Sequence, residues 1–542
     1  MTWRGAGAPA ARTTVFRILL PAVGAVTTAL AVRLYARVEW PWFALGWVGL
    51  VPWLATLDRS RSFASALGSG CLMSEAFVFA VFSWFPGALR DYGGAPWAVV
   101  VPVTALLAPL LQPQFLACAL ARQAAQRRRA AAWRIALVSA AAYSAADWAC
   151  PKLFFDTLGH GVYASVLMRQ AADLAGAHGL TFALVAANEC VLAAVTARRD
   201  GAAGVHRAVV SLGCAAGIAG ALLGYGVLRI HQLNAAAAKT EPVTAGVVQA
   251  DISHYDRLAA QIGTFDAVRM ILDTHFALST QVEARARLDF LVWPETVYPT
   301  TFGTPKSPDG AAFDREISGF VARAGLPLVF GTYDAESGHE FNAAVFLEPS
   351  SDGRLTFDTY RKSFLFPLTE RVPAILDTPA VRHWLPWMGS WTPGPGPKVI
   401  ALSLAHGREL RIAPLICYDA LVPAQTIAAV RGGAEAIVTL SNDSWFAWDG
   451  VQRLILILSA FRSIETRRPQ IRAANTGISA VITPTGKLLD SIDKDVRGTL
   501  PATVTPEAQA TTLMLAWGDW FGPAALCLCA VLLVVPPRKQ FS

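Results

Sequence analysis

The sequence predicts a multi-pass α-helical membrane domain joined to a water-exposed α/β domain, and two observations carry this prediction. More than half of the 542 residues are hydrophobic and only 16% are charged, whereas soluble globular chains are about a quarter charged. The apolar residues are concentrated in 14–231 and 512–535, while 240–510 has the composition of a soluble domain. We therefore expect a membrane bundle over 1–235, an α/β domain over 240–510, and a last spanning helix with a cytoplasmic tail over 511–542.

Eight segments are long and apolar enough to cross a membrane as helices. A spanning helix needs roughly 20 mostly apolar residues. The eight segments lie at about residues 14–36, 40–57, 64–86, 96–120, 134–150, 176–197, 207–230 and 512–535. Seven of them precede the α/β domain, which predicts a bundle of seven helices followed by one later helix.

Basic residues between these segments predict the orientation of the chain. Connections rich in Arg lie at 58–62, 121–134 and 197–207, and the last residues, PPRKQFS, are also basic. The alternate connections are nearly free of clustered Arg and Lys. Because basic loops stay in the cytoplasm, we expect both termini to be cytoplasmic and 240–510 to lie outside the inner membrane. The net charge of +7 comes mostly from these clusters, so it indicates topology rather than nucleic-acid binding.

The eight cysteines indicate neither a disulfide scaffold nor a metal site. Seven lie in or at the ends of the apolar segments, and Cys417 is the only one within 240–510. No Cys/His spacing typical of a zinc site is present. We expect no metal and no organic cofactor.

Three ionisable residues of the membrane part are candidates for more than anchoring. Glu75 lies within the third predicted span, where an ionisable group is costly and usually faces the bundle interior. Asp156 and His160 belong to the Gly-rich segment 148–165, which is too polar to span and is expected at the outer interface. A surface or re-entrant loop explains that segment as well as a substrate contact does, so both interpretations stay open.

Residues 240–510 alternate β-branched runs with helical stretches. Short apolar runs such as TAGVVQADI, LDFLVWPE and AEAIVTLSND are separated by helical patterns such as DAVRMILDTHFALSTQVEARA. This alternation predicts an α/β sandwich with its helices on the outside. Polar residues stand at the strand ends, where α/β folds place their chemistry.

Three of these strand ends carry the candidate catalytic residues. LDFLVWPE ends in Glu295, DTYRKSFLFPLTERVP contains Lys362 and Glu370, and LRIAPLICYD contains Cys417. A nucleophilic thiol needs a base and a group that stabilises the developing oxyanion. A carboxylate, an ammonium and a thiol meet these needs if they share one cleft. Taken singly, the acid and the lysine are ordinary surface residues and the cysteine is ordinary packing.

The order of the motifs WPE, YRK with PLTERVP, ICYD, SNDSWF and RAANTGISAVITPTG resembles the nitrilase, or carbon–nitrogen hydrolase, superfamily. Members of that superfamily use a Glu–Lys–Cys triad on an αββα sandwich. Nearly the whole chain resembles the membrane branch, the apolipoprotein N-acyltransferases. That resemblance implies a helical bundle in the bacterial cell inner membrane and a nitrilase-like domain on its periplasmic side.

The resemblance also implies a role for each site residue. Glu295 would be the general base, Lys362 the oxyanion stabiliser and Cys417 the nucleophile. The residues expected to support the site are Glu370, Tyr418, Asp419, Asn442 and Asp443. An aromatic loop at the substrate or the membrane would consist of Trp384, Trp387, Met388 and Trp391, with a buried cap as the alternative. Four further residues fit a structural core pattern, namely Arg462, Glu465, Arg472 and Asn475.

The reaction implied by the resemblance is a ping-pong acyl transfer. Glu295 takes the thiol proton, and Cys417 attacks an acyl ester of a phospholipid to form a thioester. The α-amine of a diacylglyceryl-cysteine lipoprotein then attacks that thioester. The expected partners are a phospholipid acyl donor, a diacylglyceryl lipoprotein acceptor and the lipid bilayer, with no nucleic acid. The protein is expected to act as a monomer.

The chain departs from the family's pattern beside the nucleophile. Asp419 follows Tyr418 where the family has Glu, which is one methylene longer, so an altered substrate is expected there first. The nearer alternative is therefore an acyltransferase or amidase of the same fold that acts on another amine or amide. A non-catalytic membrane scaffold is an alternative of another class, and the intact triad speaks against it. A solute transporter is weaker, because Glu75 alone does not form a pathway.

Overall fold

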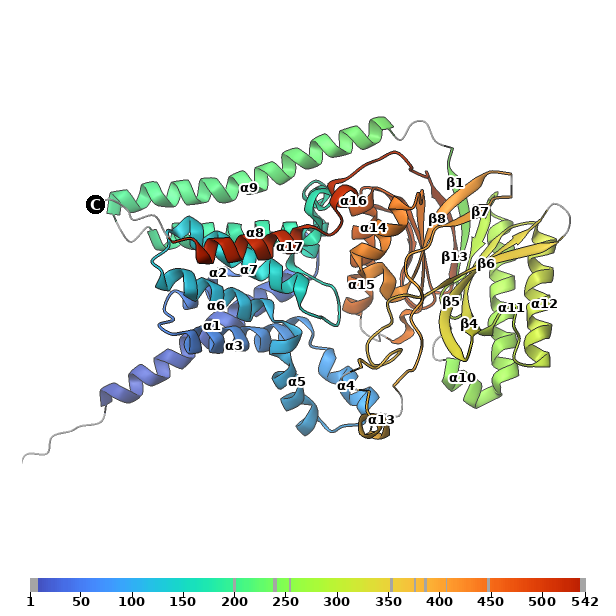
Figure 1. Ribbon diagram of the computed structural model, residues 1–542, viewed down its shortest axis with the longest axis horizontal. Helices are drawn as coiled ribbons and strands as arrows, with labels where there is room; N and C mark the ends of the chain where they lie inside the picture. Colours follow the sequence, from blue (N-terminus) through green and yellow to red (C-terminus); the bar gives the residue numbers. More distant parts are fainter. Residues whose placement is uncertain are drawn as a thin grey trace, which may run out of the picture. The chain divides into compact units, whose positions relative to one another are not determined.

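The computed structural model describes residues 8–197, 201–236, 241–252, 255–350, 354–374, 377–384, 388–405, 407–445 and 449–536. The described residues form two compact units. One unit contains the chain up to Leu228 and from Trp520 onward, and the other contains Arg229–Asp519. Figure 1 shows the first unit as helices in blue, green and red, and the sheets of the second unit in yellow, green and orange.

The first unit is built from helices. In chain order they are α1 (Ala8–Tyr35), η1 (Trp42–Trp47), α2 (Val51–Leu57), α3 (Phe63–Val81), α4 (Phe85–Gly93), α5 (Trp97–Leu111), α6 (Gln114–Arg127), α7 (Ala132–Ala149), η2 (Leu158–Ala164), η3 (Met168–Ala171), α8 (Ala172–Ala197), α9 (Gly201–Ala236) and α17 (Phe521–Val534). Large apolar side chains, Leu106 and Val209 among them, are exposed on their outer faces. Extended exposed apolar surface of this kind is typical of contact with a membrane.

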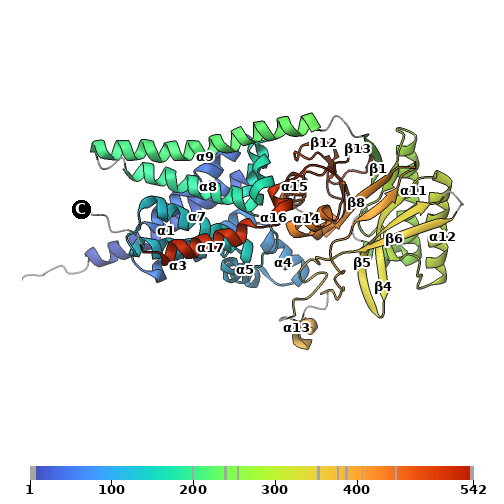
Figure 2. The ribbon, with the colours of Figure 1, turned by 45° about the horizontal axis from the view of Figure 1, so that its top comes forward.

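Helix α17, far from α7 in the sequence, packs directly against it (Figure 2). Arg134 of α7 donates a hydrogen bond from Nε to the carbonyl oxygen of Leu532, at 2.8 Å. A carbonyl near the end of a helix has no partner within that helix, so the guanidinium satisfies a group that hydrocarbon would leave unpaired. The last helix is therefore a part of the N-terminal bundle.

Three helices among the described residues are long and apolar enough to cross a membrane, namely Phe63–Val81, Met168–Ala197 and Gly201–Ala235. The number rises to four if the bent pair Trp97–Leu111 and Gln114–Arg127 forms one span. Shorter apolar helices cover Leu19–Tyr35, Trp42–Leu57 and Phe521–Val534. The expected count of about eight spans is therefore not confirmed, and it stays a prediction.

Local breaks account for part of this difference. The predicted segment 96–120 is divided near Pro113, and its two helices meet at a bend of 55°. Proline lacks an amide hydrogen and its ring clashes with the preceding turn, so helices commonly bend or end beside it. The helix of the predicted segment 64–86 ends earlier than expected, at Val81, but it is still one of the three spans. Hydropathy averaged over a window does not detect such breaks.

A buried ion-pair cluster fixes three helices of the first unit. Arg122 of α6 donates from Nε and Nη2 to the two carboxylate oxygens of Glu189, at 2.8 and 3.1 Å. Its Nη1 lies 2.7 Å from Oδ1 of Asp58, which follows α2. Breaking a buried pair by removing one partner costs about 3–5 kcal/mol, so this cluster locks α6 against α8 and the end of α2.

The second unit is a sandwich of two β-sheets. One sheet has the strand order β13-β1-β2-β4-β5-β6 with β3 beside β4, and the other has the order β12-β11-β10-β9-β8-β7. The strands are β1 (Val243–Gln249), β2 (Phe290–Val292), β3 (Tyr298–Thr301), β4 (Leu328–Glu336), β5 (His339–Pro349), β6 (Leu355–Arg361), β7 (Ile400–Ser403), β8 (Glu409–Ile416), β9 (Ala436–Ser441), β10 (Gln470–Ala474), β11 (Ser479–Ile482), β12 (Leu488–Ile492) and β13 (Gly498–Val504).

Helices cover the outer faces of both sheets. Helices α11 and α12 pack on the first sheet, while α14 and α15 lie on the outer side of the second (Figure 1). The helices are α10 (Tyr255–Ile262), α11 (Thr264–Glu283), α12 (Pro308–Ala324), α13 (Pro379–Trp384), η6 (Cys417–Leu421), α14 (Pro423–Arg431), η7 (Asp443–Trp445), α15 (Asp449–Thr466) and α16 (Leu513–Trp517). The αββα sandwich predicted for this part of the chain is confirmed.

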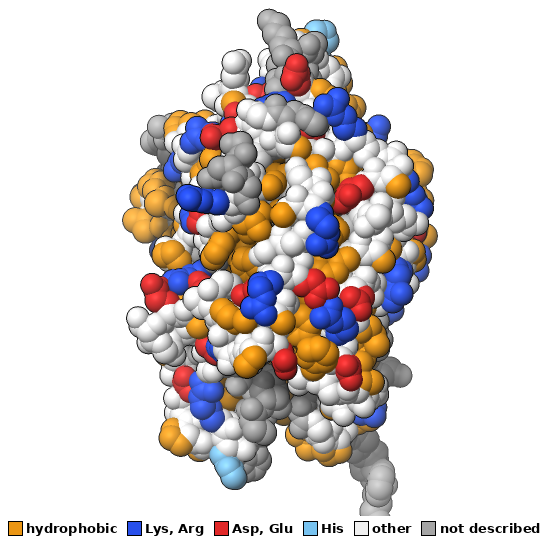
Figure 3. All heavy atoms as spheres, turned by 90° about the vertical axis from the view of Figure 1, so that its right-hand side faces the viewer, with side chains coloured by type: hydrophobic (Ala, Val, Ile, Leu, Met, Phe, Trp, Pro, Cys, Tyr) orange, Lys and Arg blue, Asp and Glu red, His pale blue; other side chains and the backbone are white. Residues whose placement is uncertain are grey.

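Three apolar cores of described residues hold the sandwich together, and the smallest, which includes Leu415 and Ile437, lies between the second sheet and α14. Side chains of both sheets, including Val247, Phe346 and Ile412, are buried between the sheets. A second core, which includes Trp293 and Phe330, lies between the first sheet and its helices. On the surface, the face drawn in Figure 3 carries Lys and Arg side chains scattered among Asp and Glu and small apolar patches. That mixture is typical of a surface in water.

Strand direction brings the predicted strand ends together. Strands β2 and β4 run parallel, as do β8, β9 and β10. Parallel neighbours end at the same edge of a sheet. Glu295 follows β2, Cys417 follows β8, and Asn442 follows β9, so the fold itself places these residues along one rim.

Close backbone packing at Gly331 of β4 predicts the effect of adding a methyl group. A Cβ there would lie 2.4 Å from the amide nitrogen of Thr296 and 2.5 Å from Cα of Glu295. Backbone atoms cannot rotate away, so Gly331→Ala should displace the turn that carries Glu295 and lower the free energy of unfolding by about 1–3 kcal/mol. Thermal unfolding of the purified protein in detergent measures the change. Gly319→Ala is the control, because its Cβ would meet only the flexible end of Arg323; equal melting temperatures for both variants would contradict the close approach.

Candidate active site

Glu295 is buried at the end of β2, and both of its carboxylate oxygens have partners. Oε1 accepts hydrogen bonds from Nδ2 of Asn342, at 2.8 Å, and from Nζ of Lys362, at 3.1 Å. Oε2 accepts the backbone N–H of Asn442, at 2.8 Å. The next residue, Thr296, has a φ of 59°, a left-handed conformation that non-glycine residues adopt at a cost. The turn therefore holds this carboxylate in a single position.

Lys362 lies directly after β6 and is almost completely buried. Its ammonium is shared by two carboxylates, with Nζ 3.1 Å from Oε1 of Glu295 and 2.8 Å from Oε1 of Glu370. Burial lowers the pKa of Lys362, but the two negative charges outweigh it, and the pKa stands well above its ordinary value. Lys362 is therefore charged at any physiological pH. Two of its three N–H groups are used by the carboxylates, which leaves one for a further acceptor.

Glu370 lies in the loop after Lys362. Its Oε2 accepts the backbone N–H of Phe366, at 2.7 Å, and its Oε1 accepts Nδ2 of Asn342, at 3.0 Å. Its charge also acts on Glu295. Burial raises the pKa of Glu295, Lys362 lowers it and Glu370 raises it, and the net effect is a raised pKa. A carboxylate with a raised pKa is better matched to taking a proton near neutral pH.

Cys417 stands at a sharp turn between β8 and the 3-10 helix η6. Its φ is 48°, a left-handed conformation that costs a non-glycine residue about 1–2 kcal/mol. The turn ends the strand at this residue and places the thiol at the rim rather than in the sheet. Burial raises the pKa of the Cys417 thiol, Glu295 raises it further, and Lys362 acts in the opposite direction. The thiol is therefore neutral at rest and needs a base to become a nucleophile.

Asp419, where the sequence leads us to expect an altered substrate first, lies in the interior of the protein, and the expectation stays a prediction. Its side chain is fully buried. Oδ1 accepts the backbone N–H groups of Ser363, at 3.2 Å, and Phe364, at 2.7 Å. Oδ2 accepts the hydroxyl of Tyr360, at 2.8 Å, and the backbone N–H of Ile416, at 3.1 Å. The carboxylate therefore joins the segment after Lys362 to the strand before Cys417.

Asn442 and Asp443 support the site from β9. The backbone of Asn442 holds Glu295, as described above. Asp443 accepts Nη2 of Arg472, at 2.8 Å, and the hydroxyl of Ser441, at 2.6 Å. Asp443 and Arg472 are both fully buried, so their pairing is structural. Asn475 in turn binds the backbone of Ile252 through both ends of its amide.

Arg462 and Glu465 form a buried ion pair on α15, with Nη2 and Oε1 2.9 Å apart. Nη1 of Arg462 donates to the carbonyl oxygen of Leu421, at 3.1 Å. Leu421 is the last residue of η6, the helix that begins at Cys417. The pair therefore supports the nucleophile turn from behind, and the structural core pattern fits the contacts of all four residues that the sequence assigns to it.

The aromatic loop contacts the site on its inner side. Tyr418, which follows the nucleophile and is not part of this loop, packs edge-on against Phe366, with ring centroids 5.2 Å apart. Met388 is buried, and the ring of Trp391 lies 4.6 Å from that of Tyr333. The backbone N–H of Trp391 also donates to the carbonyl oxygen of Glu370, at 2.9 Å. Trp384 ends α13 and Trp387 lies outside the described residues. These contacts of the described residues favour a buried cap over a loop that lies at the membrane.

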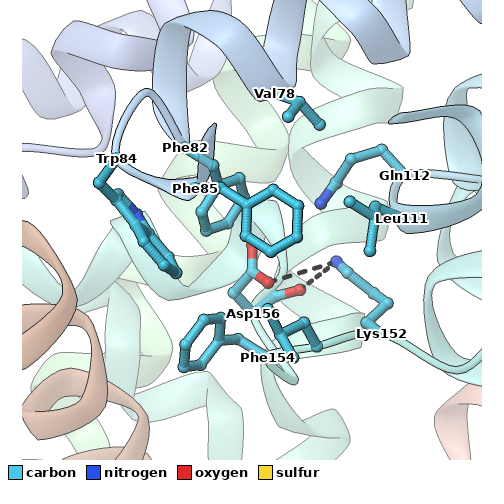
Figure 4. Close-up of a pocket in the computed structure, with 10 residues that line it drawn as sticks. Val78, Phe82, Trp84, Phe85, Leu111, Gln112, Lys152, Phe154 and Asp156 are labelled. Atoms are coloured by element: carbon cyan, nitrogen blue, oxygen red, sulfur yellow. Dashed lines mark hydrogen bonds and ion pairs between the residues drawn. The ribbon is translucent and has the colours of Figure 1, made fainter. Parts of the chain in front are cut away.

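The ionisable residues of the first unit have different surroundings. Lys152 lines a pocket with Asp156 between aromatic rings, and their charged groups point toward one another (Figure 4). Nζ of Lys152 also lies 2.8 Å from Oδ1 of Asp147. His160 accepts the backbone N–H of Thr157 through Nδ1, at 3.0 Å, and so caps the helix η2. Glu75 is partly exposed on α3 rather than buried in the bundle.

Sequence reasoning missed two residues of the site, Asn342 and Tyr360. Tyr360 lies on β6, two positions before Lys362, which directly follows that strand. Residues two apart in an extended segment share a face, so the position of Lys362 could have indicated Tyr360. Asn342 lies in the buried middle of β5, residues 341–347, where every other residue is apolar. A buried amide in such a strand needs a polar partner, but the sequence does not show which one. Among the described residues, no group of three or more His, Cys, Asp or Glu is placed to hold a metal ion.

Comparison with known families agrees with this geometry. Residues 244–512 match the carbon-nitrogen hydrolase family model, and residues 24–190 match the model of the apolipoprotein N-acyltransferase N-terminal domain. Among solved structures, an amidase from Nesterenkonia sp. aligns with 49% of this chain and 91% of its own, at 17% identity and a TM-score of 0.35. The fold and the family models thus define a membrane-bound enzyme of the carbon–nitrogen hydrolase class.

Curated relatives identify the family within this class of enzymes. The apolipoprotein N-acyltransferase of Caulobacter vibrioides is 29% identical over 514 residues, which cover 92% of this chain and 90% of the relative. That of Bdellovibrio bacteriovorus is 26% identical over 487 residues, covering 86% and 85%. Both matches span the membrane part and the sandwich. The chain belongs to the apolipoprotein N-acyltransferase family.

The buried carboxyl group of Asp419 predicts how stability depends on pH. Burial raises the pKa of Asp419 to about 6, against the opposing hydrogen bond from Phe364. Between about pH 4 and pH 6 the folded protein therefore holds a proton that the unfolded chain has lost. This contribution to stability is complete below about pH 4 and is lost as the pH rises through 6, amounting to about 3 kcal/mol.

Asp419→Asn removes this titration. We expect the melting temperature of the wild type to fall relative to that of the variant as the pH rises from 4 to 7. Asp490→Asn is the control, because Asp490 is exposed on β12 and should leave the pH dependence unchanged. A difference between wild type and Asp419→Asn that stays constant across this range would contradict the assignment.

Proposed function

We propose that this protein is a phospholipid-dependent N-acyltransferase. It moves an acyl chain through a Cys417 thioester to the α-amine of the diacylglyceryl-cysteine of apolipoproteins. One observation carries the proposal: a permanently charged Lys362 is shared by Glu295 and Glu370 at the rim where the Cys417 turn ends β8. The charges of Glu295 and Lys362 both act on the Cys417 thiol, which supports their roles as base and oxyanion donor in a chain whose relatives are named apolipoprotein N-acyltransferases.

Both substrates of this reaction are lipids, which gives the helical unit its purpose. Residues 1–235 and 511–542 anchor the protein in the bacterial inner membrane, with both termini in the cytoplasm. Residues 240–510 stand in the periplasm, where the acyl chains and the lipoprotein are within reach. The Arg-rich connections support this orientation, and the exposed apolar faces of the helices support the membrane location.

The first half-reaction forms the thioester. Glu295 takes the proton of the Cys417 thiol, and the sulfur attacks the carbonyl carbon of the phospholipid ester. The third N–H of Lys362 donates to the oxyanion that develops on the carbonyl oxygen. The carbon–oxygen bond of the ester then breaks, and Glu295 returns the proton to the leaving alkoxide. The products are a lysophospholipid and an acyl thioester on Cys417.

The second half-reaction uses the same groups in the opposite sense. The α-amine of the lipoprotein attacks the thioester carbonyl carbon, and Lys362 again donates to the oxyanion. Glu295 takes a proton from the attacking nitrogen. The carbon–sulfur bond breaks, and the thiolate receives that proton, which restores the resting enzyme. An amide has formed and no other reactant is consumed.

The alternative acceptors lose their main support in the structure. The departure at Asp419 suggested another amine or amide as substrate, but that side chain is buried and bonded within the protein. No residue that the structure describes favours the amidase or the non-catalytic scaffold over the transferase. The amidase and the scaffold can be distinguished from the transferase by measuring where the acyl chain is transferred.

A covalent acyl-enzyme is the first expected result. Purified protein incubated with a phospholipid that carries a tagged acyl chain should acquire a hydroxylamine-sensitive label, because a thioester is cleaved by hydroxylamine. Cys417→Ala should abolish the label, whereas Cys150→Ala, in the first unit, should keep it. A label that persists in Cys417→Ala would refute the nucleophile.

Chasing the labelled enzyme identifies the acceptor. A diacylglyceryl-cysteine peptide with a free α-amine should take up the tagged chain as an amide, measured by mass spectrometry. The same peptide with an acetylated amine is the control and should take up none. Release of the label only as free fatty acid would indicate a hydrolase, and an enzyme that never labels would favour the scaffold.

Loss of the Lys362 charge should slow the acylation step. Lys362→Met removes the oxyanion donor and leaves Glu295 and Glu370 without their shared cation, so the rate should fall on the order of 100-fold or more. Single-turnover labelling measures that rate. Lys398→Met is the control, because Lys398 bonds near the surface to Asp358 and to the carbonyl oxygen of Thr359. A near-normal rate for Lys362→Met would exclude its role.

A further inference from the structure

Asn342 bonds to the same two carboxylate oxygens as Lys362. Its Nδ2 lies 2.8 Å from Oε1 of Glu295 and 3.0 Å from Oε1 of Glu370. Nζ of Lys362 lies 3.1 and 2.8 Å from these same atoms. Two donors and two acceptors therefore form a closed ring of four atoms. The Asn342 backbone also takes part, because its carbonyl oxygen accepts the N–H of Lys362 at 2.8 Å.

The ring determines which atom of Glu295 is able to take a proton. A carboxylate oxygen has two lone pairs in its plane, and both of those on Oε1 are engaged, by Lys362 and by Asn342. Among the residues that the structure describes, only the backbone N–H of Asn442 donates to Oε2, so one of its lone pairs is available. The proton of Cys417 is therefore directed to Oε2. Without the amide, Oε1 would regain a lone pair and could compete with Oε2 for the proton.

The amide also fixes the two carboxylates at close range. Glu295 and Glu370 carry like charges, and the cluster with Lys362 has a net charge of −1. Of the charged groups that act most strongly on Glu295, Lys362 is a cation and Glu370 is an anion. A neutral donor that bridges both oxygens offsets part of their repulsion without adding charge. Lys362 can then keep its third N–H aimed at the oxyanion instead of turning toward the carboxylates.

The other end of the amide makes no such contribution. Oδ1 of Asn342 is buried and has no hydrogen-bond partner among the described residues. An unsatisfied buried acceptor lowers stability, so the residue is costly for the fold and useful only through its donor end. The carboxylates fix this orientation, because turning the amide over would place Oδ1 against two carboxylate oxygens.

We propose that Asn342 is a positioning residue for acyl transfer. It occupies Oε1 of Glu295, so that Oε2 serves as the base, and it holds Glu295 and Glu370 around the Lys362 ammonium. It touches neither the substrate nor the thiol, and it acts through Glu295 and Lys362. This inference rests on the proposed function for its reaction but concerns a residue and an effect that the proposal does not require.

Two nearly isosteric variants test it. Asn342→Leu removes both hydrogen bonds and should slow the single-turnover acylation of Cys417 about 10- to 100-fold, as expected for two bonds to charged acceptors. Asn342→Asp adds a third carboxylate beside Glu295 and Glu370 and should slow it at least as much at pH 8. At pH 5 to 6 that carboxylate takes up a proton and can donate it to one of the two oxygens.

The informative quantity is the ratio of the variant rate to the wild-type rate as a function of pH. For Asn342→Asp the ratio should rise at least several-fold from pH 8 to pH 5.5, whereas for Asn342→Leu it should stay constant. The other groups that titrate around this position, Glu295, Glu370, Lys362 and Cys417, are present in every protein compared. A merely structural role would give two ratios that are equally flat with pH, and that result would overturn the proposal.

A matched control distinguishes the general effect of removing a buried side-chain amide from the specific effect of removing that of Asn342. Gln470 is fully buried, and its Nε2 donates to the hydroxyls of Thr439 and Ser459, at 2.7 and 2.6 Å. Gln470→Leu should lower the melting temperature without changing the pH profile of acylation. If Asn342→Leu behaves like Gln470→Leu, with a lower melting temperature and a normal rate, the positioning role is wrong.

A second measurement keeps this test independent of the reaction. The rate at which iodoacetamide alkylates Cys417, followed by peptide mass spectrometry, reports how readily the thiol loses its proton to Glu295. The same rise in the Asn342→Asp ratio at low pH is expected there. If wild-type protein is alkylated with this pattern but never acylated by phospholipid, the proposed function fails and the positioning role stands. If wild-type protein is acylated by phospholipid and both variant-to-wild-type ratios stay constant with pH, the positioning role fails and the proposed function stands.

Discussion

One ammonium shared between two carboxylates is the interaction on which the rest of the site depends. Glu295 and Glu370 come from separate segments of the chain, and neither could be held so close to the other without Lys362 between them. Buried charges of one sign cost several kcal/mol each unless they are paired and hydrogen-bonded. Each remaining oxygen of the pair is accordingly satisfied by a backbone N–H, from Asn442 and from Phe366. The loops around the rim follow from the need to supply those donors.

The same constraint explains where strain is placed. Thr296 and Cys417 both have positive φ values, and both stand at the first turn after a strand that carries a reacting group. Strained conformations persist only where the surroundings fix them. Here the apolar cores hold the strands, while the buried Asp419 carboxylate joins the segment after Lys362 to the strand before Cys417. Asp419 therefore stabilises the arrangement of the site. In the sequence, the Asp in place of the family's Glu suggests altered chemistry, whereas in the structure its carboxylate is bonded within the protein.

Sequence patterns predicted the sandwich well and the membrane part less well, for physical reasons. Strands in a soluble α/β domain are short apolar runs bounded by polar ends, so both the order of elements and the polar residues at their ends are visible in one dimension. Helices in a membrane are defined by where the backbone bends, and a bend such as that near Pro113 is lost when hydropathy is averaged. Asn342 was missed because its importance lies in two partners, Glu295 and Glu370, that are distant in the sequence.

The sequence alone determined which groups this protein has for its chemistry: a single cysteine in the water-exposed domain, with an acid and a lysine at other strand ends, in an order that matches a known family. Only the tertiary structure decided how they work. It showed that Lys362 serves two carboxylates, that Oε2 of Glu295 has the available lone pair, and that Asp419 is turned inward. Residue types and their order are properties of the chain. Hydrogen-bond partners are properties of the fold, because they join residues that only the packing of two sheets brings within 3 Å or so of each other.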